Sequence, residues 1–148
     1  MKGYPRNFLP AVLGTVMLVI VSGLLLVPNT LAIRIDVDLG WQVGGVGRVW
    51  TAALHAAAGF ASMLLVGALW SVHMRTGWRR RQRRMSGLTV AVLFLLLAVT
   101  AVAVYYVGDE GLGTVAALAH LALGALLSFA FGWHWVRGRR RRTRGPGR

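Results

Sequence analysis

The stretch LTVAVLFLLLAVTAVAVYY, residues Leu88–Tyr106, decides the fold class, because none of its side chains is charged. About 20 apolar residues in a helix are enough to cross the hydrocarbon core of a bilayer. Three further runs of this kind lie at Phe8–Leu26, Val49–Val72 and Leu112–Val136. None alternates apolar and polar residues as a barrel strand does. The sequence therefore predicts an all-α bundle of four transmembrane helices.

The composition excludes an ordinary soluble domain. Of the 148 residues, 56% are hydrophobic and 14% are charged, whereas about a quarter of the residues in soluble domains are charged. The mean hydropathy is +0.60. The chain has no cysteine, which excludes disulfides, thiolate metal sites and cysteine nucleophiles. The four histidines are the strong candidates for metal ligands.

The charged residues predict the orientation. The chain has seventeen Lys and Arg, four Asp and Glu, and a net charge of +13. Fifteen of the bases precede the first run, separate the second from the third, or follow the fourth: Lys2, Arg6, Arg75, Arg79, Arg80, Arg81, Arg83, Arg84, Arg137, Arg139, Arg140, Arg141, Arg142, Arg144 and Arg148. The other side holds all the acids, Asp36, Asp38, Asp109 and Glu110, with Arg34 and Arg48.

By the positive-inside rule, both termini are expected in the cytoplasm, and the protein in the bacterial inner membrane. Arginines at helix ends serve orientation and attract anionic lipid headgroups, so no nucleic acid is expected as a partner. Residues 1–137 are predicted to form the membrane domain, and the Arg-rich residues 138–148 a disordered cytoplasmic tail. A signal peptide ending near Thr30 and Ala32 is the alternative for the first run, whose apolar stretch is longer than usual for a signal.

All four histidines are confined to two of the apolar runs. His55 and His73 lie in the second run, and His120 and His134 lie in the fourth. Both runs cross from the outer to the inner side in the predicted topology. His55 and His120 lie about six and eight residues into their runs, so we expect them at similar depth. Because ionisable side chains inside spans are rare and usually functional, the pattern predicts an outer and an inner histidine pair.

The helical wheel places the two histidines of each run on one face. The 18 residues from His55 to His73 return to the same azimuth, and the 14 residues from His120 to His134 miss it by about 40°. These separations rise about 27 Å and about 21 Å, so the inner histidines differ in height by about one turn. The outer pair, His55 with His120, is therefore the main prediction, and His73 with His134 is the secondary one.

A bis-histidine haem b fits these pairs better than another metal. Imidazole suits iron, zinc and copper alike, but a zinc or copper site would want three or four ligands at one depth. A haem needs two axial donors and an apolar pocket. Glycine follows each outer histidine four residues later, as Gly59 after His55 and Gly124 after His120, which clears space for a flat macrocycle.

Other polar residues extend this prediction. Arg48 is expected to pair with the propionates of an outer haem, and Arg75 and Arg137 with those of an inner haem. Tyr105, Tyr106, Asp109 and Glu110, at the outer end of the third run, are candidate proton acceptors from a quinol. The alternative for these two acids is a role as solvated turn residues.

A structural role for the histidines is the competing interpretation. His73 and His134 lie beside tryptophans near the predicted interface, where such residues are ordinary. His55 and His120 lie about two turns inside, where an imidazole needs a hydrogen-bonding partner. The hydroxyls considered for that role are Ser62, Ser71, Thr100 and Ser128.

Three features of the first half are shared with a known family: SGLLL at Ser22–Leu26, WTAALH ending at His55, and the step of five residues from His73 to Trp78. In them the chain resembles the small four-helix bacterial membrane b-type cytochromes of the cytochrome b five-six-one-like group. The resemblance implies histidine-ligated haem, with about 14 residues between the ligands of one helix. The second run departs from that spacing, since Leu69 stands where the ligand would be expected.

The second half of the sequence looks like a variation on the first. It contains Thr100, the string YYVGDE from Tyr105, His120 with its glycine, and His134. We therefore expect a two-plus-two helix repeat, since internal duplication is common among membrane proteins.

These features together predict an electron carrier, or a subunit of a membrane oxidoreductase, rather than a complete enzyme. One haem b, with a second at the inner pair, would pass electrons across the membrane. The expected partners are lipid, a quinone or a redox protein, and further subunits in a homo-oligomer or larger complex. Two alternatives stay open: a cofactor-free anchor or assembly subunit with structural histidines, and a transporter or proton path that uses His55 and His120.

Overall fold

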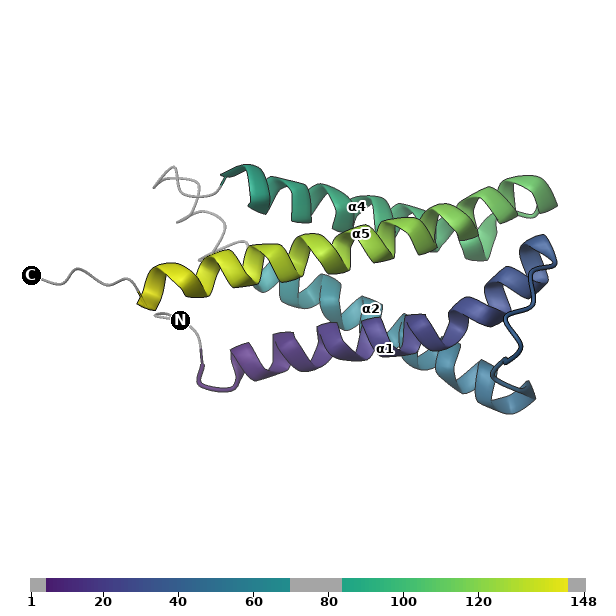
Figure 1. Cartoon of the computed structure of the whole chain (residues 1–148), viewed down its shortest axis with the longest axis horizontal. Coiled ribbons are helices and arrows are strands. Elements are labelled where there is room, and N and C mark those ends of the chain that lie inside the picture. The colour runs from purple at the N-terminus through teal and green to yellow at the C-terminus, as the bar shows by residue number, and fades with distance from the viewer. Residues whose placement is uncertain (1–4, 70–83, 144–148) are drawn as a thin grey trace, which may run out of the picture. The chain divides into compact units, whose positions relative to one another are not determined.

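The chain is helical through most of the part that its structure describes, residues 5–69 and 84–143 of a computed structural model (Figure 1). The helices are α1 (Phe8–Ile35), α2 (Gly45–Leu69), α4 (Arg84–Tyr106) and α5 (Glu110–Thr143). No strand occurs among these described residues. The prediction of an all-α fold is confirmed.

All four helices are long and apolar enough to cross a membrane. The shortest candidate span, Met85–Tyr106, has 22 residues, which gives a length of about 33 Å at 1.5 Å per residue. This matches the roughly 30 Å of a bilayer's hydrocarbon core. Many large apolar side chains are exposed, among them Leu64 and Phe129 at 78% and 79%, as expected for helices that face lipid. The chain is a multi-pass integral membrane protein.

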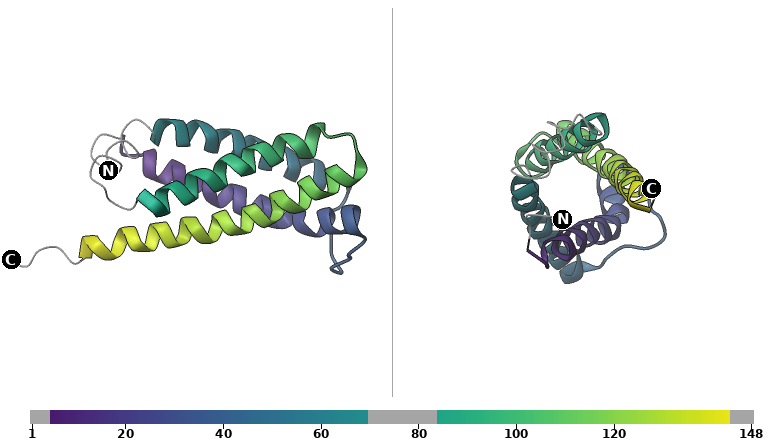
Figure 2. Two further views of the ribbon diagram at one scale, coloured as in Figure 1. Left: turned by 90° about the horizontal axis from the view of Figure 1, so that it is seen from above. Right: turned by 90° about the vertical axis from the view of Figure 1, so that its left-hand side faces the viewer.

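Two compact units make up the chain, Met1–Arg80 and Arg81–Arg148. In the first unit α1 packs against α2, and in the second α4 packs against α5. Each unit is thus one helical hairpin, and the two helices of each can be followed side by side in Figure 2. The predicted two-plus-two repeat requires two hairpins of this kind, and the internal duplication itself stays a prediction.

Two helices extend beyond the runs predicted from hydropathy. α1 continues past Leu26 to Ile35, although Pro28 lies inside it. Proline removes one backbone donor, but spanning helices tolerate this where neighbouring groups restore the bonding. Figure 1 shows α1 bending in its last third, as expected at a proline. α5 continues to Thr143, so residues 138–143 are helical, and the expected domain boundary after residue 137 stays a prediction.

The connection between α1 and α2 is tied to α1 by one buried amide. Asn29 is only 5% exposed. Its Nδ2 donates to the carbonyl oxygen of Val43 at 3.0 Å, and its Oδ1 accepts from the backbone N–H of Val43 at 3.1 Å. The side chain therefore satisfies both backbone groups of a loop residue, as a paired strand would, and fixes where α2 begins.

Replacing Asn29 by alanine is expected to destabilise the first hairpin. The change leaves the N–H and C=O of Val43 without their protein partner, which costs about 1–3 kcal/mol in the free energy of unfolding. Denaturant unfolding of the purified full chain in detergent measures the effect. Thr30→Ala is the matched control, because Thr30 Oγ1 donates only within its own helix, to the carbonyl oxygen of Leu26. Equal unfolding midpoints for the two variants would contradict the role of Asn29.

The connection between α4 and α5 is short and ends in a helix cap. Asp109 Oδ1 accepts from the backbone N–H of Leu112 at 2.8 Å, which satisfies one of the N–H groups left unpaired at a helix start. Glu110 lies in the first turn of α5, where a negative charge favours the helix dipole. Asp109 therefore has the role of a turn residue, and proton transfer from a quinol stays a prediction.

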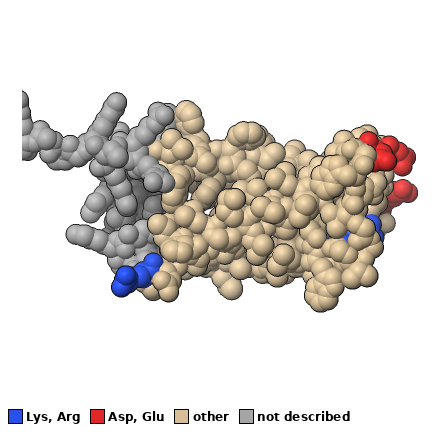
Figure 3. All heavy atoms as spheres, turned by 60° about the horizontal axis from the view of Figure 1, so that its bottom comes forward, with Lys and Arg blue, Asp and Glu red and all other residues tan. Residues whose placement is uncertain are grey.

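Charged side chains lie at helix ends. On the face drawn in Figure 3, the surface between the ends is uncharged in the described part of the chain. Arg34 lies in the last turn of α1, where a positive charge complements the helix dipole. Most of the arginines behind the predicted orientation fall outside the residues whose side chains are described. The cytoplasmic location of the termini therefore stays a prediction.

Candidate functional site

The described histidines lie on the second helix of each hairpin. His55 is on α2, and His120 and His134 are on α5. All three are half-buried. His73 lies outside the described residues, so the predicted inner pair is described on one side alone.

His55 and His120 have the same register in their helices. α2 begins at Gly45 and α5 begins at Glu110, so each histidine is the eleventh residue of its helix. At 1.5 Å per residue, each lies about 15 Å from the first residue. Both helices begin a few residues before the apolar runs predicted from hydropathy. Counted from the helix starts, His55 and His120 have the same position, whereas counted from the runs they differ by about two residues.

His55 is held by a hydroxyl on α1. Its Nδ1 lies 3.0 Å from Ser22 Oγ, and Ser22 is 2% exposed. Ser22 Oγ also lies 2.6 Å from the carbonyl oxygen of Leu18, one turn earlier in α1.

Gly23 makes room for this imidazole. A Cβ built on Gly23 would lie 3.0 Å from Cε1 of His55 and 3.5 Å from its Nδ1. Almost any larger residue there would push the ring away from Ser22. The pair Ser22–Gly23 in the string SGLLL therefore supplies a hydroxyl and the space for the ring that binds it.

His120 is held in the same way by α4. Its Nδ1 lies 3.0 Å from Thr100 Oγ1. Thr100 Oγ1 donates back into its own helix, with the carbonyl oxygen of Leu96 at 3.0 Å and that of Leu97 at 3.1 Å. The first helix of each hairpin thus provides a hydroxyl, and the second provides the histidine.

A third contact of this kind involves His134. Its Nδ1 lies 3.2 Å from Ser86 Oγ, near the start of α4. We call the three contacts hydroxyl–imidazole pairs: Ser22–His55, Thr100–His120 and Ser86–His134. Two of the three are in the second hairpin, where the histidines are 14 residues apart.

The second hydrogen bond of each hydroxyl, to its own helix, favours one tautomer of His55 and His120. A hydroxyl has one proton to donate, and the carbonyl oxygens of Leu18 and Leu96 can only accept it. When each hydroxyl gives its proton to its own helix, its oxygen accepts from the Nδ1–H of the ring. A neutral imidazole with its proton on Nδ1 carries its lone pair on Nε2. Nε2 is then the atom able to ligate a metal.

The glycines predicted to make room for a macrocycle have open space beside them. A Cβ built on Gly59 or Gly124 would meet no heavy atom within 4 Å. The same holds eight residues further along, at Gly67 and Gly132. Both histidine helices therefore share the pattern His-x3-Gly-x7-Gly. The prediction from the sequence used the first glycine of this pattern and not the second.

Arg48 is one of the three arginines predicted to pair with haem propionates, and the structure describes its side chain. It is exposed, and it lies seven residues before His55 in α2. Seven residues turn a helix by about 700°, so both residues lie on one face, about 10 Å apart along the axis. Arg75 and the side chain of Arg137 fall outside the described residues.

No three His, Cys, Asp or Glu side chains come together within residues 5–69 and 84–143. A zinc or copper site with three or four such ligands is therefore not formed in this part of the chain. A haem site differs, because it takes two protein ligands on opposite faces of the macrocycle.

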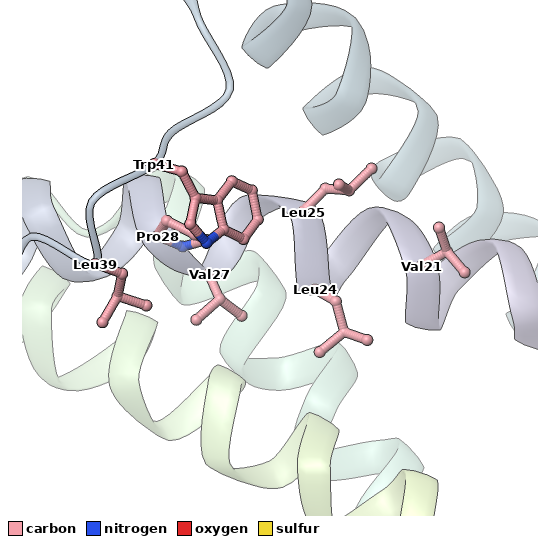
Figure 4. A pocket seen from close by; sticks show the side chains of 7 residues that line it. All are labelled: Val21, Leu24, Leu25, Val27, Pro28, Leu39 and Trp41. Atoms are coloured by element: carbon pink, nitrogen blue, oxygen red, sulfur yellow. The ribbon is translucent and has the colours of Figure 1, made fainter.

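An apolar groove of about 370 Å³ lies beside the second half of α1. Figure 4 shows Trp41, from the connection to α2, beside Pro28. The groove is lined by Val21, Leu24, Leu25, Val27, Pro28, Leu39 and Trp41. No histidine lines it, so it is distinct from the hydroxyl–imidazole pairs.

No family model, no curated protein and no solved structure matches the chain. The similarity to b-type cytochromes therefore rests on the short strings quoted above. The geometry of the histidines and their hydroxyl partners is the main structural basis for a function.

Proposed function

We propose that the chain binds haem b within the membrane and carries electrons across it. Nε2 of His55 and Nε2 of His120 are the proposed axial ligands of an outer haem. The observation that carries this proposal is the repeated hydroxyl–imidazole pair. In both hairpins the hydroxyl occupies Nδ1, and the histidine is the eleventh residue of its helix.

The donor set supports iron in a haem. Metal-bound histidines nearly always donate their second ring N–H to a neighbouring oxygen, which fixes the ring and the tautomer. Ser22 and Thr100 provide that oxygen here. His55 and His120 are each the eleventh residue of their helix, which is a register suited to two ligands of one haem if α2 and α5 cross the membrane in the same direction.

The surroundings support a flat apolar ligand. Open space beside Gly59 and Gly124, one turn beyond each histidine, suits the edge of a macrocycle. Arg48, on the face of His55 toward the start of α2, suits a propionate. Apolar side chains on both helices would keep water from the iron.

Haem b supplies one-electron chemistry when bound. The residues of this chain bind and orient it. His55 and His120 would hold the haem through their Nε2 atoms, and the group would then serve for electron transfer. The membrane helices hold the site at a fixed depth, so that a donor on one side and an acceptor on the other reach it in turn.

An inner haem on His73 and His134 remains the secondary proposal. The Ser86–His134 pair gives His134 the same kind of support as the outer histidines receive. The support for an inner haem therefore comes from His134, because His73 lies outside the described residues.

The competing function is that of a cofactor-free anchor or assembly subunit. The same hydrogen bonds favour it, because a packed histidine also needs a partner for its ring N–H. Under this interpretation, Ser22 and Thr100 stabilise their hairpins, and Nε2 has no ligand to bind.

The haem spectrum of the purified full chain separates the two functions. After expression with adequate haem supply, we expect a Soret band, a reduced α-band of b-type haem, and about one haem per chain by the pyridine haemochromogen assay. A chain carrying both His55→Gln and His120→Gln is the control for adventitious haem. Helical, monodisperse protein without these bands would contradict the proposal and favour the anchor.

A further inference from the structure

We infer that Ser22 and Thr100 are positioning residues that regulate the reduction potential of the outer haem. The inference rests on the proposed function and goes beyond it. It assigns each hydroxyl a defined effect on the imidazole: the hydroxyl holds the proton on Nδ1 and makes Nε2 a stronger electron donor.

The contact distances of Ser22 Oγ indicate the direction of its hydrogen bonds. Ser22 Oγ lies 2.6 Å from the Leu18 carbonyl oxygen, at the short end of the range for O–H···O bonds. Its second helix contact, with the Val19 carbonyl oxygen, is longer at 3.3 Å. The proton of this hydroxyl is therefore directed at Leu18. The oxygen accepts from His55 Nδ1, 3.0 Å away.

The second hairpin contains a corresponding hydroxyl–imidazole pair, Thr100–His120. Thr100 Oγ1 lies 3.0 Å from the carbonyl oxygen of Leu96, four residues earlier, 3.1 Å from that of Leu97 and 3.0 Å from His120 Nδ1. In the inferred tautomer it donates to its own helix and accepts from His120 Nδ1. Ser22 and Leu18 are also four residues apart. Two hairpins with different side chains, serine and threonine, reach one arrangement: an imidazole donates to a hydroxyl that donates to its own helix.

The hydrogen bond at Nδ1 affects how strongly Nε2 donates electrons to a bound iron. Hydrogen bonds in a chain polarise one another, so a hydroxyl that already donates is a better acceptor. A stronger Nδ1–H bond makes Nε2 more basic. A more basic ligand stabilises ferric iron over ferrous iron, which lowers the reduction potential. Loss of either hydroxyl is expected to raise that potential.

The contact between Ser22 and His55 is sheltered and fixed. Ser22 is 2% exposed, and Gly23 leaves the ring a slot with no spare width. Water has little access to replace the serine hydroxyl. The hydroxyl is also anchored by its own helix, so its position does not depend on the bound ligand.

Matched variants isolate the hydroxyl from side-chain volume. Ser22→Ala and Thr100→Val remove the hydroxyl, whereas Ser22→Thr and Thr100→Ser keep it. Thr15→Val on α1 and Thr89→Val on α4 are controls, because each hydroxyl donates to the carbonyl four residues earlier, that of Ala11 or Met85. Both control residues lie in the same helices as the test residues.

Redox titration of the haem-loaded full chain is the first measurement. We expect the midpoint potential to rise in Ser22→Ala and Thr100→Val and haem affinity to fall about 10- to 100-fold, the usual effect of losing such a partner. Ser22→Thr and Thr100→Ser should restore the potential. Thr15→Val and Thr89→Val should leave it unchanged.

The second measurement does not need haem. In the full chain with ¹⁵N-labelled histidine, purified from haem-limited cells into lipid, His55 and His120 should show the Nδ1-protonated tautomer. Ser22→Ala should change the signal of His55 and leave that of His120. Nε2-protonated rings in the unaltered chain would overturn the inference.

The outcomes separate this inference from the proposed function. If the unaltered chain binds haem but the hydroxyl-free variants keep its potential, the inference fails and the proposed function stands. If the unaltered chain binds no haem, both fail. A raised potential that the hydroxyl-retaining variants restore supports both.

Discussion

Replacing either His55 or His120 by glutamine is expected to abolish binding of the outer haem. Glutamine can still donate a hydrogen bond to Ser22 or Thr100, so the hairpin contact is kept. It offers no imidazole nitrogen to iron. Changes next to a metal ligand already cost about 10- to 100-fold in affinity, so loss of the ligand itself should cost more. Haem content per purified chain and the Soret absorbance measure the effect.

His134→Gln is the matched control for these two variants. It makes the same chemical change on α5 and also keeps a hydrogen bond to the hydroxyl partner, here Ser86. The outer haem should remain, and any loss would be limited to an inner haem. If His55→Gln and His120→Gln both retain the full absorbance, the proposed ligands are wrong.

Filling the space beside the histidines is expected to have the second large effect. Gly59→Leu and Gly124→Leu place a branched side chain where the structure leaves a Cβ no neighbour within 4 Å. The helices themselves should tolerate leucine, which favours a helix over glycine by up to about 1 kcal/mol. A bound macrocycle would be crowded instead, and overpacking of about 1–3 kcal/mol lowers haem affinity by roughly ten- to hundredfold.

Gly67→Leu and Gly132→Leu test whether that effect belongs to the histidine face. Each glycine lies twelve residues after its histidine, which turns it about 120° away on the helix. Each also has open space beside it. Haem titration of the four variants should show weakened binding for Gly59→Leu and Gly124→Leu alone. Equal affinities across all four would contradict a macrocycle at the first pair of glycines.

The fold was predictable from apolar length because a membrane span leaves a long uncharged run. The ends of the helices were less predictable. Hydropathy falls at Pro28 and Asn29, so the first run was expected to stop at Leu26. In the structure α1 continues because both residues are buried, and the amide of Asn29 binds Val43 in the connection. Such long-range bonds leave no periodic signal in the sequence.

The candidate site was predictable in part. The outer histidines and the glycines that follow them can be identified from spacing on a helix, and Thr100 was one of the hydroxyls available to a buried imidazole. Ser22 was not recognised as the partner of His55. α1 is apolar on all sides, so its sequence does not indicate which side faces α2, and the contact depends on that rotation. A polar residue followed by glycine, as in Ser22–Gly23, was the available signal.

The shared register of His55 and His120 also has an electrical consequence. α2 has 25 residues and is about 37 Å long, so a haem held by His55 would lie about 15 Å from the first residue of that helix, well inside the proposed span. Moving one elementary charge across the whole membrane involves about 2.3 kcal/mol per 100 mV. An electron that reaches a haem at this depth from either side would cross only part of the voltage. Each of the two steps would then respond to the membrane potential by less than this amount.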